Sequence, residues 1–268
     1  MGAAVAAQAR RQGTEVLWCP AGRSAASKER AEQHGLTAVS DLAAMTERVD
    51  VILSICPPAN AVEVADAVAG LHFSGIYVDG NAVSPETVAR IGDVVSTAGA
   101  TVVDGAVVGS PPSDSKRARL YLSGPAAALT EVAEIFADSA VHTHLLEGGL
   151  GRASALKLSY SSYQKTSRVL VGVAYALATE YGVEDELLDI AQGRTNSYLS
   201  ETDYVPKTAA RAWRWSPELR EAASALAAVN LPPDLVEAAA RVMGHWATAK
   251  DRSMNMREAL DLLHDRSE

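Results

Sequence analysis

The chain has 268 residues, of which 48% are hydrophobic and 21% are charged, and its formal net charge at pH 7 is −9. This composition is typical of an ordinary folded protein and disfavours a largely disordered chain. The negative charge argues against nucleic acid and anionic membranes as partners, because both would repel the chain on average. The two cysteines, Cys19 and Cys56, suggest no disulfide framework and favour a reducing compartment.

The amino-terminal part alternates helix-like and strand-like segments from residue 1 to about residue 147. This alternation predicts parallel strands that are joined by crossover helices. The first segment is a helix of small residues that runs towards Gly13. The expected strands are residues 14–19, 51–56, 75–79, 101–106, 119–123 and 142–146, and the expected helices are residues 24–34, 60–71, 84–97 and 125–138.

The remaining part of the chain is expected to be helical. Residues 150–181 contain no proline, and their apolar residues recur at helical spacing, which predicts one long interdomain helix. After residue 182 only helices are expected, with breaks near Gly193, Pro206, Pro217 and Pro232. We therefore expect an α/β domain over residues 1–147, with a doubly wound parallel sheet, and an all-α domain over residues 148–268.

The sequence also predicts where the protein acts and that it holds no metal. No apolar run approaches the roughly 20 residues that span a bilayer. The first residues run into Arg10 and Arg11, which is the reverse of a secretory signal, so we expect a soluble cytoplasmic protein. The six histidines show no metal-ligand spacing, because His142 and His144 lack a third ligand.

Five motifs follow one another in the order of a known family: the Arg23–Ser24 turn, SICPP (54–58), DGNAVSP (79–85), DGAVVGSPP (104–112) and GGLGRASALK (148–157). Together they resemble the 3-hydroxyisobutyrate and 6-phosphogluconate dehydrogenase superfamily of NAD(P)-dependent β-hydroxyacid dehydrogenases. The tail PKTAARAWRWSPELREAA (206–223) is similar to a branch of NAD(P)-dependent oxidoreductases with a phosphogluconate-dehydrogenase-like C-terminal domain. The resemblance implies a Rossmann-like fold, a small-molecule substrate and a homodimer.

In this family the first strand ends in the loop GLGxMG, and Met1–Gly2 matches its last two residues. The resemblance therefore implies that the first, central strand lies upstream of this sequence, so its neighbours would lose their ladder partners. It also places Gly2 beside the cofactor phosphates at the start of the first helix. The alternative is that this segment is the Ala-rich first helix of another fold.

The residues after the second strand of the family's fold predict the choice of cofactor. No carboxylate lies between Val16 and Lys28, where an NAD-binding chain would hold the ribose hydroxyl. Arg23 and Ser24 suit the 2'-phosphate of NADP instead, with NAD as the other cofactor and a solvated loop arginine as the alternative. By resemblance, Cys56 and Pro57 touch the cofactor, whereas Cys56 as a small buried hydrophobe is the other interpretation.

Two further loops are expected to contact the substrate. Asn81 lies where the family contacts substrate and nicotinamide, but asparagine in a turn also serves local backbone bonding, and both roles stay open. DGAVVGSPP matches the family's DAPVSGG loop, so Gly109 and Ser110 are expected to hold a substrate carboxylate. The serine is displaced from the family's position and Val108 stands in the middle, which indicates a different acid or none.

Lys157 is the predicted catalytic residue. Gly148, Gly151 and Ala153 precede it at the spacing of the family's GxxGxGxxxK, so the resemblance implies an acid–base role in hydride transfer. Lys165 is expected on the same helix face, where a second cation would lower the pKa of Lys157 and would contact substrate. The alternative for Lys157 is an ordinary solvated helix lysine.

The pocket is expected to depart from the family beside this lysine. Ser161 stands where the family has asparagine, and Tyr160 could supply the proton instead. Trp213, within Trp213–Arg214–Trp215, either contacts substrate or packs in a core or interface. The prediction is an NADP-dependent oxidoreductase of a small hydroxy acid or related carbonyl compound. Its alternatives are an imine or ketone reductase and a cofactor-free scaffold.

Overall fold

The computed structural model describes residues 1–11, 13–193, 198, 203–228 and 230–264. The chain divides into two compact units, residues 1–161 and 162–268, and each is considered by itself. The long helix α7 (Arg152–Glu180) contributes residues to both units. Its bounds lie close to the expected range 150–181.

The first unit contains a five-stranded sheet. Its strands follow the chain order β3 (Val51–Ser54), β4 (Ile76–Asp79), β5 (Thr101–Gly109), β6 (Ala118–Ser123) and β7 (Val141–Leu145). All neighbouring strands are parallel except β5 and β6, which form an antiparallel pair. The expected doubly wound parallel sheet is confirmed, with this one antiparallel pair as the departure, because the connection 110–117 is too short for a crossover.

A second, two-stranded sheet lies outside this one. It consists of β1 (Leu17–Trp18) and β2 (Thr37–Ala38), which pair in parallel. Within the described part of the chain, no ladder joins β1 or β2 to β3.

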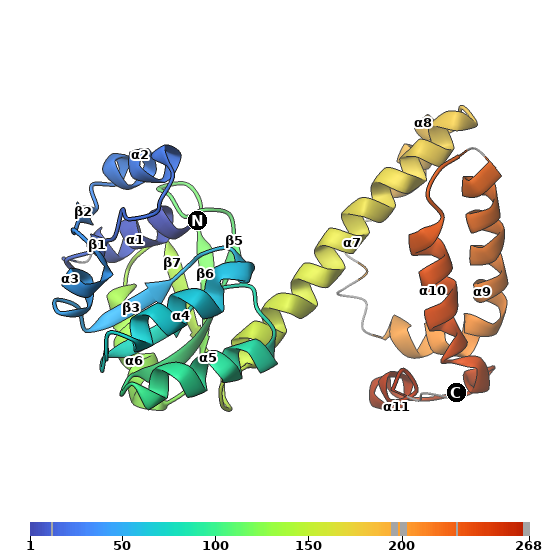
Figure 1. Ribbon diagram of the computed structural model, residues 1–268. Helices are drawn as coiled ribbons and strands as arrows, with labels where there is room; N and C mark the ends of the chain where they lie inside the picture. Colours follow the sequence, from blue (N-terminus) through green and yellow to red (C-terminus); the bar gives the residue numbers. More distant parts are fainter. Residues whose placement is uncertain (12, 194–197, 199–202, 229, 265–268) are drawn as a thin grey trace. The chain divides into compact units, whose positions relative to one another are not determined.

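Helices cover both faces of the five-stranded sheet (Figure 1). One core contains side chains of α4 (Ala61–Ala69), α5 (Pro85–Thr97) and Tyr77 of β4. The opposite core contains side chains of α1 (Gly2–Arg11), α6 (Ala126–Ile135) and Val78, the next residue of β4. Because neighbouring strand residues point to opposite faces, this partition gives the predicted doubly wound, Rossmann-like layering.

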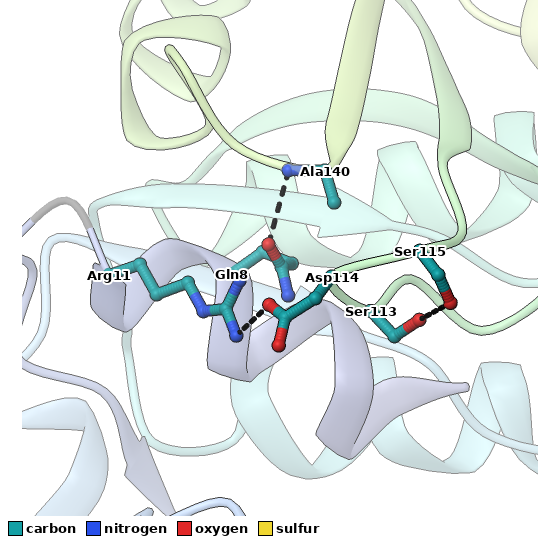
Figure 2. Close-up of polar contacts among 6 residues, drawn as sticks. All are labelled: Gln8, Arg11, Ser113, Asp114, Ser115 and Ala140. Atoms are coloured by element: carbon teal, nitrogen blue, oxygen red, sulfur yellow. Dashed lines mark hydrogen bonds and ion pairs between the residues drawn. The ribbon is translucent and has the colours of Figure 1, made fainter.

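Two polar contacts and a buried apolar face hold α1 against the rest of the unit (Figure 2). The buried Gln8 accepts the backbone N–H of Ala140 at 3.1 Å, just before β7. Arg11 forms an exposed ion pair with Asp114 at 2.7 Å, in the connection between β5 and β6. The apolar side chains Val5 and Ala9 pack in the core on the same face. Burial of α1 is therefore its main anchor, since an exposed ion pair contributes little.

Short elements complete the first unit. The helix α2 (Ala25–Gln33) was expected, whereas β2 and α3 (Leu42–Thr46) were not predicted. Asp41 caps α3 by accepting the N–H of Ala44 at 2.8 Å. A 3₁₀ turn, Pro58–Asn60, follows β3 and leads into α4.

The second unit is helical, as predicted. It contains α8 (Glu184–Gln192), α9 (Tyr204–Ala228), α10 (Asp234–Gly244), a 3₁₀ turn (Ala247–Ala249) and α11 (Met256–Asp261). The expected break near Pro217 is wrong, because α9 continues through this residue. A proline inside a helix costs about 3 kcal/mol. Burial of Ala223, Leu226 and Val236 between α9 and α10 offsets that cost.

No helix in the described ranges is both long and apolar enough to cross a membrane.

Candidate functional site

The carboxyl edge of the sheet gathers several of the predicted residues. Cys56 and Pro57 follow the end of β3, and Asn81 follows the end of β4. The first helix begins at the same edge, because a Cβ on Gly2 would lie 3.6 Å from the carbonyl oxygen of Ile55. This edge is where open α/β sheets bind their ligands, and a helix that begins there directs N–H groups towards an anion.

The side chain of Asn81 joins the two strand ends. Its Oδ1 accepts the backbone N–H of Cys56 at 2.6 Å, and its Nδ2 donates to Ser54 Oγ at 3.1 Å and to Asp79 Oδ2 at 3.0 Å. The backbone N–H of Asn81 also donates to Asp79 Oδ1 at 3.0 Å. Asn81 is only 3% exposed, so these buried bonds fix the segment after β3 against the segment after β4. Of the two roles left open by the sequence, this geometry supports the local one.

Burial controls the protonation of this network. It raises the pKa of the Asp79 carboxyl group, and the charge of Asp104 raises it further, while the bonds from Asn81 act in the opposite direction. Partial burial also raises the pKa of the Cys56 thiol, which disfavours a reactive thiolate. The hydroxyl group of Tyr77 is buried beside them, and its pKa is raised for the same reason.

Asp79→Asn is expected to remove a pH-dependent contribution to stability. The pKa of Asp79 in the folded chain lies above its ordinary value of 3.8. Its contribution is therefore fully present below that value and is lost as the pH rises through the raised pKa. Urea unfolding between about pH 4 and pH 8 should show the advantage of the wild type over the variant shrinking as pH rises.

Asp93→Asn is the matched control, because Asp93 is an exposed carboxylate on α5. The difference in unfolding free energy between this variant and the wild type should not change with pH over the same range. If the stability of the wild type relative to Asp79→Asn increased with pH, the raised pKa of Asp79 would be contradicted.

Arg23 and Ser24 lie where a strand of the small sheet leads into α2. Ser24 caps this helix by accepting the N–H of Ser27 at 3.3 Å, and the two hydroxyl oxygens lie 3.1 Å apart. Arg30 donates to Ser27 Oγ at 3.0 Å. Arg23 is exposed. The hydroxyl groups of Ser24 and Ser27 and the guanidinium group of Arg30 therefore lie together near the N-terminus of α2.

Lys157 lies beside the end of β5. Its Nζ donates to the carbonyl oxygen of Val107 at 2.6 Å, and the side chain is half-buried. Asp104 pairs with the last residue of β4, so Val107 lies three residues, or about 10 Å, beyond that strand end. The structure therefore brings Lys157 to the segment that contains Gly109 and Ser110, which are both exposed. Gly109 has a φ of 118°, a conformation that favours glycine.

The remaining predicted residues lie in α7 and in the second unit. Tyr160 is 37% exposed and Ser161 is half-buried, both in α7. The side chains of Lys165 and Arg214 lie outside the described part of the structure. Trp213 belongs to the second unit and is 46% exposed, with Lys250 Nζ 4.2 Å from its ring centroid. This cation–π contact covers one face of the Trp213 ring.

The sequence analysis missed Asp104. This carboxylate is fully buried in β5 and accepts hydrogen bonds from the residues that begin α7. Its only signal in the sequence was a charge inside an otherwise apolar strand. No cluster of three metal-ligating side chains occurs among the residues that the structure describes.

Comparison with protein families gives two matches. The NAD binding domain of 6-phosphogluconate dehydrogenase matches residues 1–147, and a domain of unknown function matches residues 178–246. An uncharacterised 28.5 kDa protein of Methanothermus fervidus is 30% identical over 178 residues, which cover 66% of this chain and 67% of that protein.

Solved structures with a similar fold include a conserved protein of unknown function that is itself similar to 3-hydroxyacid dehydrogenases. It is 26% identical, with 92% of this chain and 93% of that chain covered and a TM-score of 0.58. A reductive aminase from Aspergillus terreus, in complex with NADPH and ethyl levulinate, has a TM-score of 0.70. It is 19% identical, over 97% of this chain and 95% of that chain, which shows a common fold alone.

Proposed function

Since the chain belongs to the β-hydroxyacid dehydrogenase-like family, through its NAD binding domain of the 6-phosphogluconate dehydrogenase type, we propose that it is an NADP-dependent oxidoreductase. Its substrate is a small hydroxy acid or the corresponding carbonyl compound. The observation that carries this proposal is the position of Lys157, whose Nζ lies 2.6 Å from the carbonyl oxygen of Val107 at the carboxyl edge of the sheet.

Residues of three elements would hold the cofactor. The first N–H groups of α1, at Gly2, would donate to the diphosphate, because the first turn of a helix leaves its N–H groups without intrahelical partners. Arg23, with the hydroxyl group of Ser24, would bind the 2'-phosphate of NADP through charge-assisted bonds. Cys56 and Pro57 would form the wall beside the dinucleotide, which Asn81 keeps in place through its bond to the Cys56 N–H.

Lys157 would exchange the proton of the reaction. The bound nicotinamide supplies or accepts the hydride. As the substrate hydroxyl group becomes a carbonyl group, the amine form of Lys157 accepts its proton, and in the reverse direction the ammonium form protonates the oxygen. The bond to Val107 aims Nζ before the substrate arrives, which lowers the entropic cost of the step.

The exposed segment beyond Val107 would position the substrate. Gly109 and Ser110 offer backbone N–H groups and one hydroxyl group to a carboxylate. Ser161, one turn after Lys157, would orient the reacting oxygen, and Tyr160 is the second proton donor at this position. Contacts of Lys165 and Trp213 with substrate stay predictions, as do the homodimer and the cytoplasmic location.

The proposed activity is tested by following NADPH absorbance. Purified chain is supplied with NADP and L-serine, as a small hydroxy acid, and separately with NADPH and 2-oxo acids or short aldehydes. Cofactor turnover with an oxygen-bearing substrate is expected. The absence of turnover with all of them, in a chain that binds NADPH, would overturn the proposed substrate class.

An imine or ketone reductase is the second candidate. Ser161 favours it, because a short side chain in place of the family's asparagine leaves room for a substrate other than a hydroxy acid. Tyr160 favours it as an alternative proton donor. NADPH with ethyl levulinate, in the presence and absence of methylamine, separates the two activities. Consumption of NADPH that requires the amine would favour imine reduction.

Arg23→Ser is expected to raise the Kd for NADPH by about 10- to 100-fold, the factor that corresponds to loss of charged hydrogen bonds. The Kd for NADH should stay unchanged, because NADH lacks the 2'-phosphate. Fluorescence titration of both cofactors measures the two constants. Arg90→Ser, which removes an exposed arginine from α5, is the control. Equal weakening of both cofactors would contradict a phosphate contact.

A further inference from the structure

Asp104 carries a role that the sequence did not indicate. We propose that Asp104 is a positioning residue, which fixes the start of α7 and thereby the place of the Lys157 amino group. The proposal rests on the proposed function for its catalytic consequence. Its structural part, the dependence of Lys157 on Asp104, stands on the hydrogen bonds alone.

The carboxylate of Asp104 is held at the first turn of α7. Its Oδ2 accepts the backbone N–H of Gly151 at 2.9 Å and that of Ser154 at 3.0 Å. Its Oδ1 accepts the hydroxyl group of Ser154 at 2.7 Å. Because the carboxylate comes from β5, it acts as a cap that is supplied by another element, and it ties the helix to the sheet.

A second hydroxyl group completes this cluster. Ser123 Oγ, on the neighbouring strand β6, donates to Asp104 Oδ2 at 3.1 Å and accepts the N–H of Ala153 at 3.2 Å. Asp104, Ser123 and Ser154 are all fully buried. A buried carboxylate is costly unless its oxygens are satisfied, and here the N-terminal end of the helix adds a favourable partial charge. The charge of Asp104 and the start of α7 therefore stabilise each other.

The geometry connects this cap directly to Lys157. Ser154 and Lys157 are three residues apart in α7, so they lie on the same helix face. Asp104 and Val107 are three residues apart in β5. The strand therefore holds the helix at two points. The Asp104 carboxylate binds its first turn, and the Val107 carbonyl oxygen accepts a hydrogen bond from Lys157 Nζ. A shift of the first turn would move the amino group away from the segment that is proposed to bind substrate.

Asp104→Asn tests the proposal, because it keeps the size of the side chain but removes its charge and directs an NH₂ group at N–H donors. The readout that needs no substrate is acetylation of Lys157 by acetic anhydride, measured by mass spectrometry over a range of pH. Lys207, an exposed lysine of the second unit, is the internal reference. The labelling rate of Lys157 relative to Lys207 should rise by about 10-fold, the factor that one hydrogen bond contributes.

Ser154→Ala is the milder variant, since it removes only the bond to Oδ1 and leaves the charge and the backbone bonds in place. It should change the labelling of Lys157 in the same direction by a smaller factor, and it decides the question if the Asn variant does not fold. Unchanged labelling of Lys157 at every pH, in a folded variant, would overturn the proposal.

The catalytic consequence is measured separately. With any substrate that the wild type turns over, Asp104→Asn should lower kcat by about 100-fold, the cost of displacing a catalytic group by about 1 Å, with little change in KM. Failure of the proposed function would appear differently, as full turnover by a Lys157 variant. The labelling result would still stand or fall by itself.

Discussion

Replacement of Lys157 by Met is expected to lower kcat of the NADPH-dependent reaction by about 10²- to 10⁴-fold, the usual contribution of a general acid or base. Methionine keeps the unbranched side chain but has no proton to exchange and cannot donate to Val107. The Kd for NADPH should change little, because the cofactor-binding residues lie on other elements. Stopped-flow measurement of NADPH oxidation gives kcat, and fluorescence titration gives the Kd.

Lys116→Met is the matched control for this experiment. Lys116 is exposed in the connection between β5 and β6, so its loss removes one positive charge from the same unit without touching α7. It should leave kcat unchanged. If the Lys157 variant retained the wild-type kcat, the acid–base assignment would be wrong and Tyr160 would become the first candidate for the proton donor.

Leu122→Ala is expected to destabilise the first unit by about 2–5 kcal/mol, the range for removing a large side chain from a packed core. Leu122 is fully buried in β6, in the core that also contains α1 and α6. The loss comes from the apolar area returned to water and from the cavity that is left. Urea unfolding followed by circular dichroism measures the change.

The neighbouring strand supplies the control. Leu145 is the register partner of Leu122 on β7, but it is 50% exposed. Leu145→Ala should change stability by no more than about 0.5 kcal/mol, as is usual for surface substitutions. Equal destabilisation by both variants would show that Leu145 is packed as closely as Leu122, which contradicts its exposure in the structure.

The sequence predicted the elements of the first unit where local patterns and burial agree. The helix α5 begins at Pro85 after the cap Ser84, within its expected range of residues 84–97, and the apolar segments beginning at Val51 and Thr101 became strands. The direction of β6 was not predictable in this way. The apolar pattern of the strand is the same for either direction, and the direction follows instead from the connection 110–117, which is too short for a crossover.

The candidate site was predictable at the level of motifs but not of contacts. Lys157 was found from its glycine frame, and the structure adds the bond to Val107. The burial of Asn81 could not be predicted, because its partners Ser54 and Cys56 are distant in the sequence. The role of Asp104 was hidden for the same reason, since its bonds reach residues about 50 positions further along the chain. Long-range hydrogen bonds leave no periodic signal in the sequence.

The central claim is that the carboxyl edge of this sheet binds a nicotinamide dinucleotide. Titration of the full chain with NADPH, followed by the fluorescence of the reduced nicotinamide ring, tests it most directly. The predicted result is a saturable change in emission that reaches its plateau at one NADPH per chain. An emission that rises only in proportion to the NADPH added, as it does without protein, would contradict the claim and favour a scaffold role.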